Sequence, residues 1–251
     1  LANRAPVVMI YGTPSHDTEG SLEVFEQIES RYGVTILQPG RKYFLVHRPV
    51  EERGEVVESP HSFDCAKALL FGVPEPNKKW LLANAGAMGK DQADEAARSA
   101  MRALFLGLGG MRKEHAELPC VLLYHGQDRG AKTATGYTAD SGLAVTRDDL
   151  AAVGADYIAL GDIHEPPQIP GLPAYYPGSI YPINWGETHK AGANVVEIRA
   201  ASTGDLFARS SPDVVVSRLE FPHPQRMKIA HTYGQVWTGC VVGKQVWVET
   251  T

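Results

Sequence analysis

Short, unbroken apolar runs recur along this chain with helical segments between them, and this alternation narrows the range of possible folds more than any other feature. The clearest runs are Ala5–Tyr11, Pro119–Tyr124 and Asp156–Leu160. All three have the length and the Val, Ile, Leu and Tyr content of strands. Continuous apolar runs suit strands that are covered on both faces. Because helical patterns separate these runs, the sequence predicts an α/β fold rather than an all-β sandwich.

Weaker patterns predict the remaining strands and helices. Further strands are expected over Val34–Leu37, Tyr43–Val46, Glu51–Glu58, Lys79–Ala83, Asn194–Ile198 and Val214–Phe221. Helices are expected from Ser21, with Leu22, Phe25 and Ile28 on one face, from Asp91 to about Leu106, and from an N-cap at Thr146 to Gly154. The glycine-rich stretch Leu106–Gly110 follows a helix instead of opening one, so we expect it to end that helix.

Composition excludes several classes of protein. The chain has 251 residues, of which 43% are hydrophobic and 21% charged, as in ordinary globular proteins. No apolar run approaches the roughly 18 residues of a membrane span, and we see no signal peptide pattern. A net charge of −5 excludes a polycationic nucleic-acid coat, although an enzyme that meets phosphate through metal ions stays open. Three widely spaced cysteines suggest no disulfide framework, which predicts a reducing cytoplasm.

A histidine follows each of the three clearest apolar runs. His16, His125 and His164 occupy these positions, with Asp17 and Asp162 beside two of them. Ligands of open α/β sheets bind at the carboxyl ends of strands. Residues two apart on an extended backbone point the same way, so Asp162 and His164 are expected to reach one metal or two adjacent metals. Taken singly, each motif is common, and His16-Asp17 alone is equally a plain turn with a helix cap.

The segment Tyr157–Pro166, followed by Tyr176–Ile180, resembles the signature of the bacterial SbcD-type nuclease subunit, a calcineurin-like metallophosphoesterase. In that family a strand reads Tyr-x-Ala-Leu-Gly-His-x-His, and a Pro-Gly-Ser segment follows. His125-Gly126 matches the family's His-Gly motif, and Ser15-His16-Asp17 resembles its Gly-Asn-His-Asp motif. The resemblance covers roughly residues 5–200, and Tyr157–Glu187 is its specific part.

The resemblance implies a fold, an activity and partners. The implied fold is of the α/β class. A layered β-sandwich flanked by helices (αββα), the nuclease domain without its N-terminal portion, is expected over residues 1–205, followed by a linker and the start of a small α/β capping domain over residues 206–251. The implied activity is metal-dependent DNA phosphodiester hydrolysis, exonuclease or endonuclease, in double-strand break repair or recombination. DNA and an SbcC-type ATPase are the implied partners, with a homodimer left open and no membrane.

The family uses two divalent metal ions, usually Mn²⁺, which activate a water and stabilise the attacking and leaving oxygens. The metal ligands carried over to this sequence are His125, Asp162, His164 and Ser15. His16 would protonate the leaving oxygen or steady the scissile phosphate, and Asp17 would orient His16. Asn184 and Glu187 are candidates to support these residues from behind.

Three differences from the family pattern are the reason to consider alternatives to the DNA nuclease function. Ser15 replaces an asparagine ligand, Asp162 replaces a histidine, and the family's Asp-x-His and Gly-Asp-x-x-Asp segments have no counterpart before Ser15. We therefore expect the chain to be a fragment of a longer protein that holds less than a full two-metal site. The alternatives are a small-molecule phosphoesterase of the same superfamily and a catalytically silent DNA-binding or scaffold relative.

Overall fold

The main sheet has seven strands. A computed structural model describes residues 1–48, 51–60, 62–76, 90–128, 145–164, 168–182, 187, 189–199, 212–222, 225–231 and 244–250. The strand order of the main sheet is β4-β3-β5-β6-β7-β9-β8. Its members are β3 (Tyr43–Arg48), β4 (Arg53–Val57), β5 (Ala66–Val73), β6 (Cys120–His125), β7 (Tyr157–Gly161), β8 (Gln168–Ile169) and β9 (Ala174–Tyr175). The central strands β5, β6, β7 and β9 run parallel, so their carboxyl ends meet at one edge.

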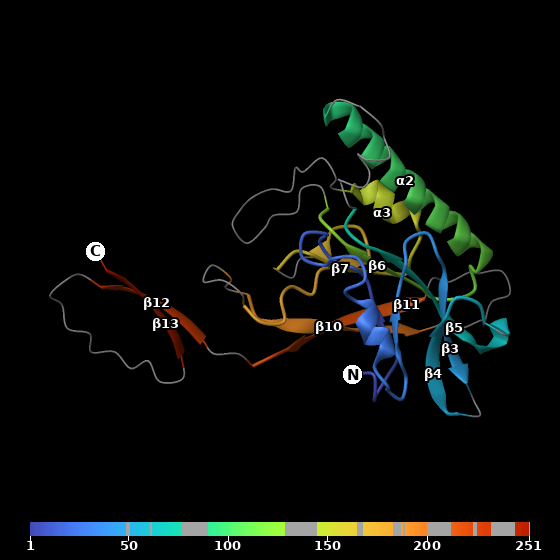
Figure 1. Cartoon of the computed structure of the whole chain (residues 1–251), viewed down its shortest axis with the longest axis horizontal. Coiled ribbons are helices and arrows are strands. Elements are labelled where there is room, and N and C mark those ends of the chain that lie inside the picture. Colours follow the sequence, from blue (N-terminus) through green and yellow to red (C-terminus); the bar gives the residue numbers. More distant parts are fainter. Residues whose placement is uncertain are drawn as a thin grey trace.

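Three further sheets have two strands each. In the first, β1 (Val7–Met9) pairs in parallel with β2 (Val34–Ile36). In the second, β10 (Gly192–Arg199) pairs antiparallel with β11 (Asp213–Glu220). The domain boundary predicted between residues 205 and 206 therefore falls between two strands that pair with each other. In the third, β12 (Gln225–His231) pairs in parallel with β13 (Lys244–Thr250) and lies apart from the main sheet (Figure 1).

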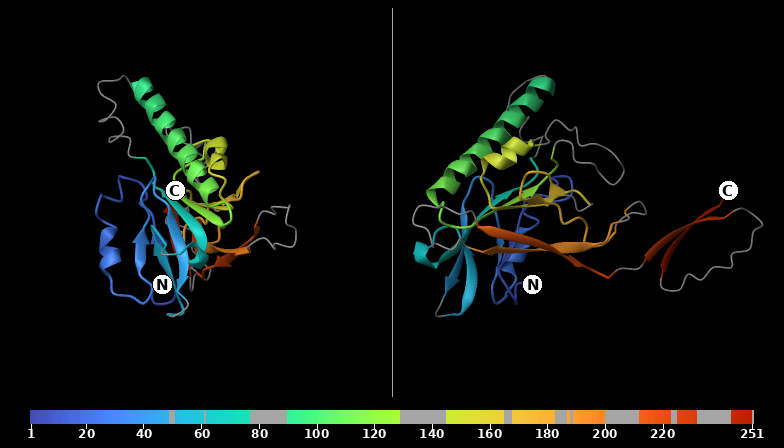
Figure 2. Two further views of the ribbon diagram at one scale, coloured as in Figure 1. Left: turned by 90° about the vertical axis from the view of Figure 1, so that its right-hand side faces the viewer. Right: turned by 180° about the vertical axis from the view of Figure 1, so that it is seen from behind.

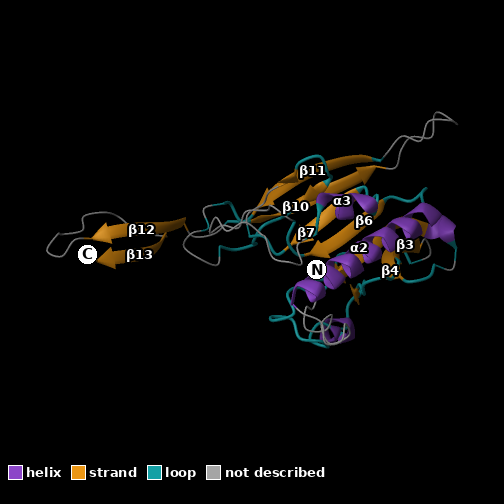
Figure 3. Cartoon of the chain, turned by 90° about the horizontal axis from the view of Figure 1, so that it is seen from above, coloured by secondary structure: helices purple, strands orange, loops and turns teal. Residues whose placement is uncertain are grey.

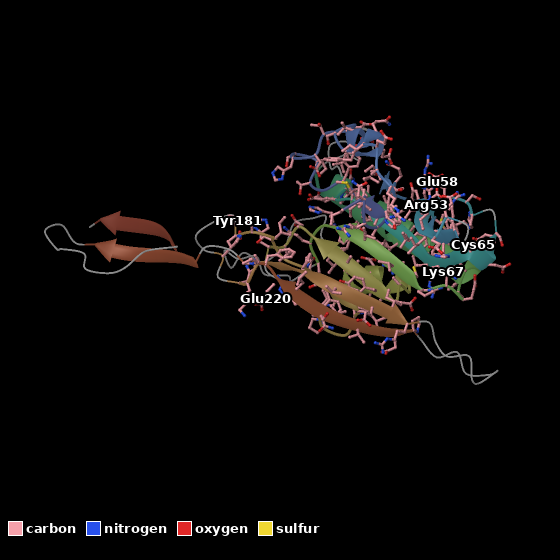
Figure 4. The ribbon with its side chains drawn as sticks, turned by 90° about the horizontal axis from the view of Figure 1, so that it is seen from below. Arg53, Glu58, Cys65, Lys67, Tyr181 and Glu220 are labelled. Carbon is pink, nitrogen blue, oxygen red and sulfur yellow. The ribbon has the colours of Figure 1, made fainter. Side chains whose placement is uncertain are left out.

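Both α-helices are on one side of the main sheet. The two α-helices are α2 (Lys90–Glu114) and α3 (Arg147–Ala152), and Figure 2 shows them packed side by side. Two short 3-10 turns, η1 (Glu23–Gln27) and η2 (Phe63–Cys65), complete the described helices. Seen from above, α2 and α3 lie over the sheet (Figure 3), and the view from below leaves strands of the sheet visible beside β10 and β11 (Figure 4). The protein is therefore a layered α/β structure with a mixed main sheet.

Alternation along β6 shows why both faces of the main sheet are apolar. Cys120, Leu122 and Tyr124 are buried in the larger core, together with Met101 and Phe105 of α2. The intervening Val121 and Leu123 point to the opposite face, where they pack in a second cluster with Val8 and Ile10 around buried Leu37, Tyr43 and Leu70. The β1–β2 pair thus covers the face opposite to α2, and the predicted burial of this strand on both faces is confirmed.

Several predicted elements are present. Strands β1, β6 and β7 form at the three clearest apolar runs, and β6 and β7 each end one residue beyond the run. Thr146 caps α3 through a capping box: its hydroxyl accepts from the Asp149 amide, and the Asp149 carboxylate accepts from the Thr146 amide. Gly154 follows α3 with φ of 65°, as a helix terminator requires. The strand expected over Lys79–Ala83 lies outside the described residues.

Three predictions about local structure are wrong. The sequence pattern predicts no strand over Ala66–Val73, yet β5 is central to the main sheet. The glycine-rich stretch does not end α2, which is 25 residues long and continues past the glycines to Glu114. The helix expected from Ser21 is only the 3-10 turn η1, and Phe25 and Ile28, which the prediction placed on one helix face, are 38% and 54% exposed.

The described part of the chain contains no helix long and apolar enough to cross a membrane. Its two described cysteines, Cys65 and Cys120, are both free thiols. Burial of Cys120 in the core raises the pKa of its thiol to about 12, because the thiolate loses its hydration there.

Candidate active site

A cavity of about 600 Å³ opens where β1, β6 and β7 end. Five of the six residues predicted from the sequence line it: His16, Asp17, His125, Asp162 and His164. The sixth, Ser15, is exposed and is not part of the lining. The structure therefore brings together side chains from three segments that are far apart in the sequence, and it leaves Ser15 aside.

His125 reaches the cavity through a turn that depends on two glycines. It is the last residue of β6 and pairs with Gly161, the last residue of β7. A Cβ at Gly161 would lie 2.7 Å from the His125 ring, so glycine makes room for the imidazole. Gly126 has φ of 150°, and a Cβ there would lie 2.3 Å from the Tyr124 hydroxyl. The Tyr176 hydroxyl donates to the Gly126 carbonyl at 3.0 Å and fixes this turn.

Two buried tyrosines support this wall of the cavity from behind. Burial raises the pKa of both Tyr124 and Tyr176, because a phenolate would be poorly hydrated there. Both hydroxyls therefore remain protonated at neutral pH. The Tyr176 hydroxyl also accepts a hydrogen bond from the backbone amide of Asp128 at 3.1 Å, so the whole turn after β6 is held in place.

Asp162 does not continue the extended geometry of β7. Its φ is 91°, a conformation that residues other than glycine seldom adopt. The expectation that Asp162 and His164 point the same way from an extended backbone is therefore wrong, although both side chains line the cavity. Asp162 turns toward His125, with its Oδ1 atom 3.9 Å from the His125 Nε2 atom.

His164 is held by a buried carboxylate. Its Nδ1 atom lies 2.7 Å from Oε1 of Glu187, whose side chain has no exposed surface. The Ser179 hydroxyl donates to Oε2 of Glu187 at 3.2 Å, and it lies 3.0 Å from Nε2 of His189. The Ser179 amide also donates to the His164 carbonyl at 2.9 Å. These contacts fix both the ring and the backbone of His164.

The pairing expected between His16 and Asp17 is not what the structure shows. Oδ2 of Asp17 accepts a hydrogen bond from the Gly12 amide at 2.6 Å. Among the described residues, no hydrogen bond joins Asp17 to the exposed ring of His16. The reason is local: the turn after Thr13 brings the Asp17 carboxylate back onto the end of β1. Asp17 therefore shapes the loop and does not hold the His16 ring.

The described residues do not fit a two-metal centre. Within the described ranges, no group of three or more His, Cys, Asp or Glu side chains could hold a metal ion. Two of the predicted ligands approach each other, Nε2 of His125 and Oδ1 of Asp162, at 3.9 Å. One ion with bonds of about 2.0–2.2 Å could span that separation. His164 instead uses one ring nitrogen on Glu187.

Sequence reasoning missed part of this site. No motif marks His189, and no role is predicted for Ser179. Glu187 was named without an assigned partner. The usable signal was the Pro-Gly-Ser segment, since Gly178 has φ of 71° and turns Ser179 back onto His164. Asn184 lies outside the described residues.

No family model matches the sequence, and no curated protein matches it. The resemblance to the SbcD-type nuclease subunit thus depends on the motifs of this sequence alone.

Proposed function

We propose that this chain is a phosphoester hydrolase of the nuclease type, with DNA phosphodiesters as its substrates. The observation that carries the proposal is the convergence of His16, His125, Asp162 and His164 on one cavity from three separate segments. Strand ends are where α/β proteins gather binding groups. Imidazole and carboxylate side chains are suited to the proton transfers of ester hydrolysis.

His164 is the proposed proton acceptor. Glu187 lies at hydrogen-bond distance from Nδ1, so a proton on Nδ1 leaves Nε2 with its lone pair. Nε2 then accepts a proton from the attacking water, and the buried carboxylate stabilises the resulting imidazolium, as an orienting acid does in other histidine-dependent sites. The contact from Ser179 holds Glu187 in position for this role.

His16 is the proposed proton donor to the leaving oxygen. Its ring is exposed and lines the same cavity as His164. Asp17 contributes by holding the loop through the Gly12 amide. With one histidine taking a proton and another giving one, the site handles both halves of a hydrolysis.

Divalent metal ions, the DNA substrate and the partner all enter the proposal through the resemblance. Two Mn²⁺ ions do not fit the described residues, so the proton transfers described above are assigned to the chain's own side chains. The likeness of Tyr157–Glu187 to the nuclease branch supports DNA as the substrate and an SbcC-type ATPase as the partner. A cytoplasmic location is proposed on the free thiols of Cys65 and Cys120.

Cleavage of labelled linear duplex and single-stranded DNA, with and without Mn²⁺, tests the proposal. We expect cleavage by the unaltered chain and its loss in His16→Ala and His164→Ala. His47→Ala is the matched control, because His47 is exposed on β3 and outside the cavity. Hydrolysis of small phosphoesters without DNA cleavage would overturn the DNA assignment, and equal cleavage by all variants would overturn the site.

One observation favours a second candidate, the catalytically silent relative. The described residues offer only the His125 and Asp162 pair as a close set of predicted ligands, without a third group for one ion. Such a protein would bind DNA or an assembly partner without turnover. Retained DNA binding, together with no hydrolysis of DNA or of small phosphoesters in Mn²⁺, would select this candidate.

A further inference from the structure

A second cavity of about 430 Å³ lies beside the first, on the other side of the loop after β1. Gly12 and Asp17 line both cavities. The remaining walls of the second cavity come from the end of β5, from the turn at Gln38 and Pro39, and from α2. Its size lies within the usual range for small-molecule sites, about 300–1,000 Å³.

The lining of this second cavity combines apolar and acidic side chains. On the α2 side, Ala100, Met101 and Leu104 present apolar surface. The rest of the lining includes three carboxylates, those of Asp17, Glu19 and Glu75, and the described lining holds no Lys, Arg or His. The carboxylates of this lining attract a cationic group, and its apolar side chains accept an apolar body.

Glu75 supplies the specific contact. Its Oε2 atom is buried and has no hydrogen-bond partner. Leaving a buried carboxylate oxygen without a donor costs free energy, which a donor from a ligand would recover. Because α2 contributes apolar side chains to the same cavity, that donor should be carried on an apolar body of small size.

We propose that this second cavity binds an apolar, preferably aromatic molecule bearing an amino or amidinium group, with Glu75 as the acceptor of its N–H. This site goes beyond the phosphoesterase proposal and does not depend on it. Two sources have this chemistry: a nucleobase with an exocyclic amino group, and a separate small organic amine. The shared wall at Asp17 would place either of them next to the first cavity.

Calorimetric titration with benzamidine tests the site without any hydrolysis. We expect saturable binding of one benzamidine per chain, and at least about tenfold weaker binding of neutral benzamide, which carries no positive charge to pair with the carboxylates. Glu75→Gln should weaken benzamidine binding about tenfold or more. Glu29→Gln is the matched control, since Glu29 is exposed and outside the cavity, and it should bind as the unaltered chain does.

A second variant and two nucleosides sharpen the test. Leu104→Trp should fill the cavity and abolish benzamidine binding whatever the state of Glu75. Binding of cytidine but not uridine, lost in Glu75→Gln, would identify a nucleobase as the occupant, whereas binding of benzamidine alone would identify a separate amine. Absence of saturable benzamidine binding, or equal affinity in Glu75→Gln and Glu29→Gln, would overturn the proposal.

Discussion

The Nδ1 atom of His164 lies 2.7 Å from Oε1 of Glu187, and the Glu187 side chain has no exposed surface. The two residues are 23 positions apart, and the chain returns to His164 through the turn at Gly178 and Ser179. A buried carboxylate behind an imidazole fixes its tautomer and its orientation. His164 is therefore prepared for one function at its other ring nitrogen, Nε2.

Replacing Glu187 by Gln should impair hydrolysis more than it impairs folding. Gln keeps the volume and a contact for Ser179, but it removes the negative charge that stabilises a protonated His164. We expect kcat/KM for phosphodiester hydrolysis to fall by about 10- to 100-fold, with most of the loss in kcat. Glu197→Gln is the control, because Glu197 is an exposed residue of β10 that pairs with Arg199. Unchanged kcat in Glu187→Gln would contradict the positioning role.

Gly109 is a packing residue of α2, and a pair of glycine substitutions tests this. A Cβ at Gly109 would lie 2.2 Å from the carbonyl oxygen of Ala152 in α3, whereas a Cβ at Gly107 would meet nothing within 4 Å. Gly109→Ala should lower the free energy of unfolding by about 1–3 kcal/mol. Gly107→Ala should raise it by about 0.5–1 kcal/mol, because alanine favours the helix. Urea denaturation measures both, and equal stability of the two variants would be inconsistent with this packing.

The same glycines show how far the sequence could predict the fold. Gly107, Gly109 and Gly110 look like a helix end, and only the approach of α3 explains why α2 continues past them. Strand β5 was missed for a related reason. Gly72 interrupts its apolar run, yet a Cβ there would lie 2.4 Å from the Cβ of Leu37, so glycine is needed for β2 to pack on the sheet. Contacts between distant segments decided both cases.

For the site, the sequence alone predicted which residues line the cavity wherever those residues lie at the end of a strand. His125 ends β6 and Asp162 follows β7. These strands pair in parallel, and the parallel sheet brings the two side chains together. The hydrogen-bond partners of the site's side chains were not predictable in the same way. Asp17 bonds to Gly12 instead of His16 because of a turn, and Ser179 meets His189 because of a left-handed glycine.

The two described cysteines should differ in reactivity. Burial raises the pKa of Cys120 from 9.0 to about 12, so its thiol stays protonated and covered at pH 8. Iodoacetamide at pH 8 should modify the half-buried Cys65 and leave Cys120 unmodified until the protein unfolds, as read by peptide mass spectrometry. The raised pKa also means that stability is lost as the pH rises above about 9, since the unfolded chain then releases this proton first. Rapid modification of Cys120 in the folded protein would contradict its burial.

Manganese binding should fall short of a two-metal centre. The described residues provide one close pair of predicted ligands, His125 and Asp162, separated by 3.9 Å. Calorimetric titration with Mn²⁺ should therefore show at most one weak site, and Asp162→Asn should remove it. Two tight Mn²⁺ sites on this chain would contradict the reading of the cavity.

The central claim is that His164 and His16 carry out phosphoester hydrolysis in one cavity. The most direct measurement is the rate of hydrolysis of bis(p-nitrophenyl) phosphate, in Mn²⁺ and in its absence, by the unaltered chain, His164→Ala and His47→Ala. Loss of one general acid or base costs about 100- to 10,000-fold in rate. We predict a loss of that size in His164→Ala and an unchanged rate in His47→Ala. Equal rates in the unaltered chain and in His164→Ala would contradict the claim.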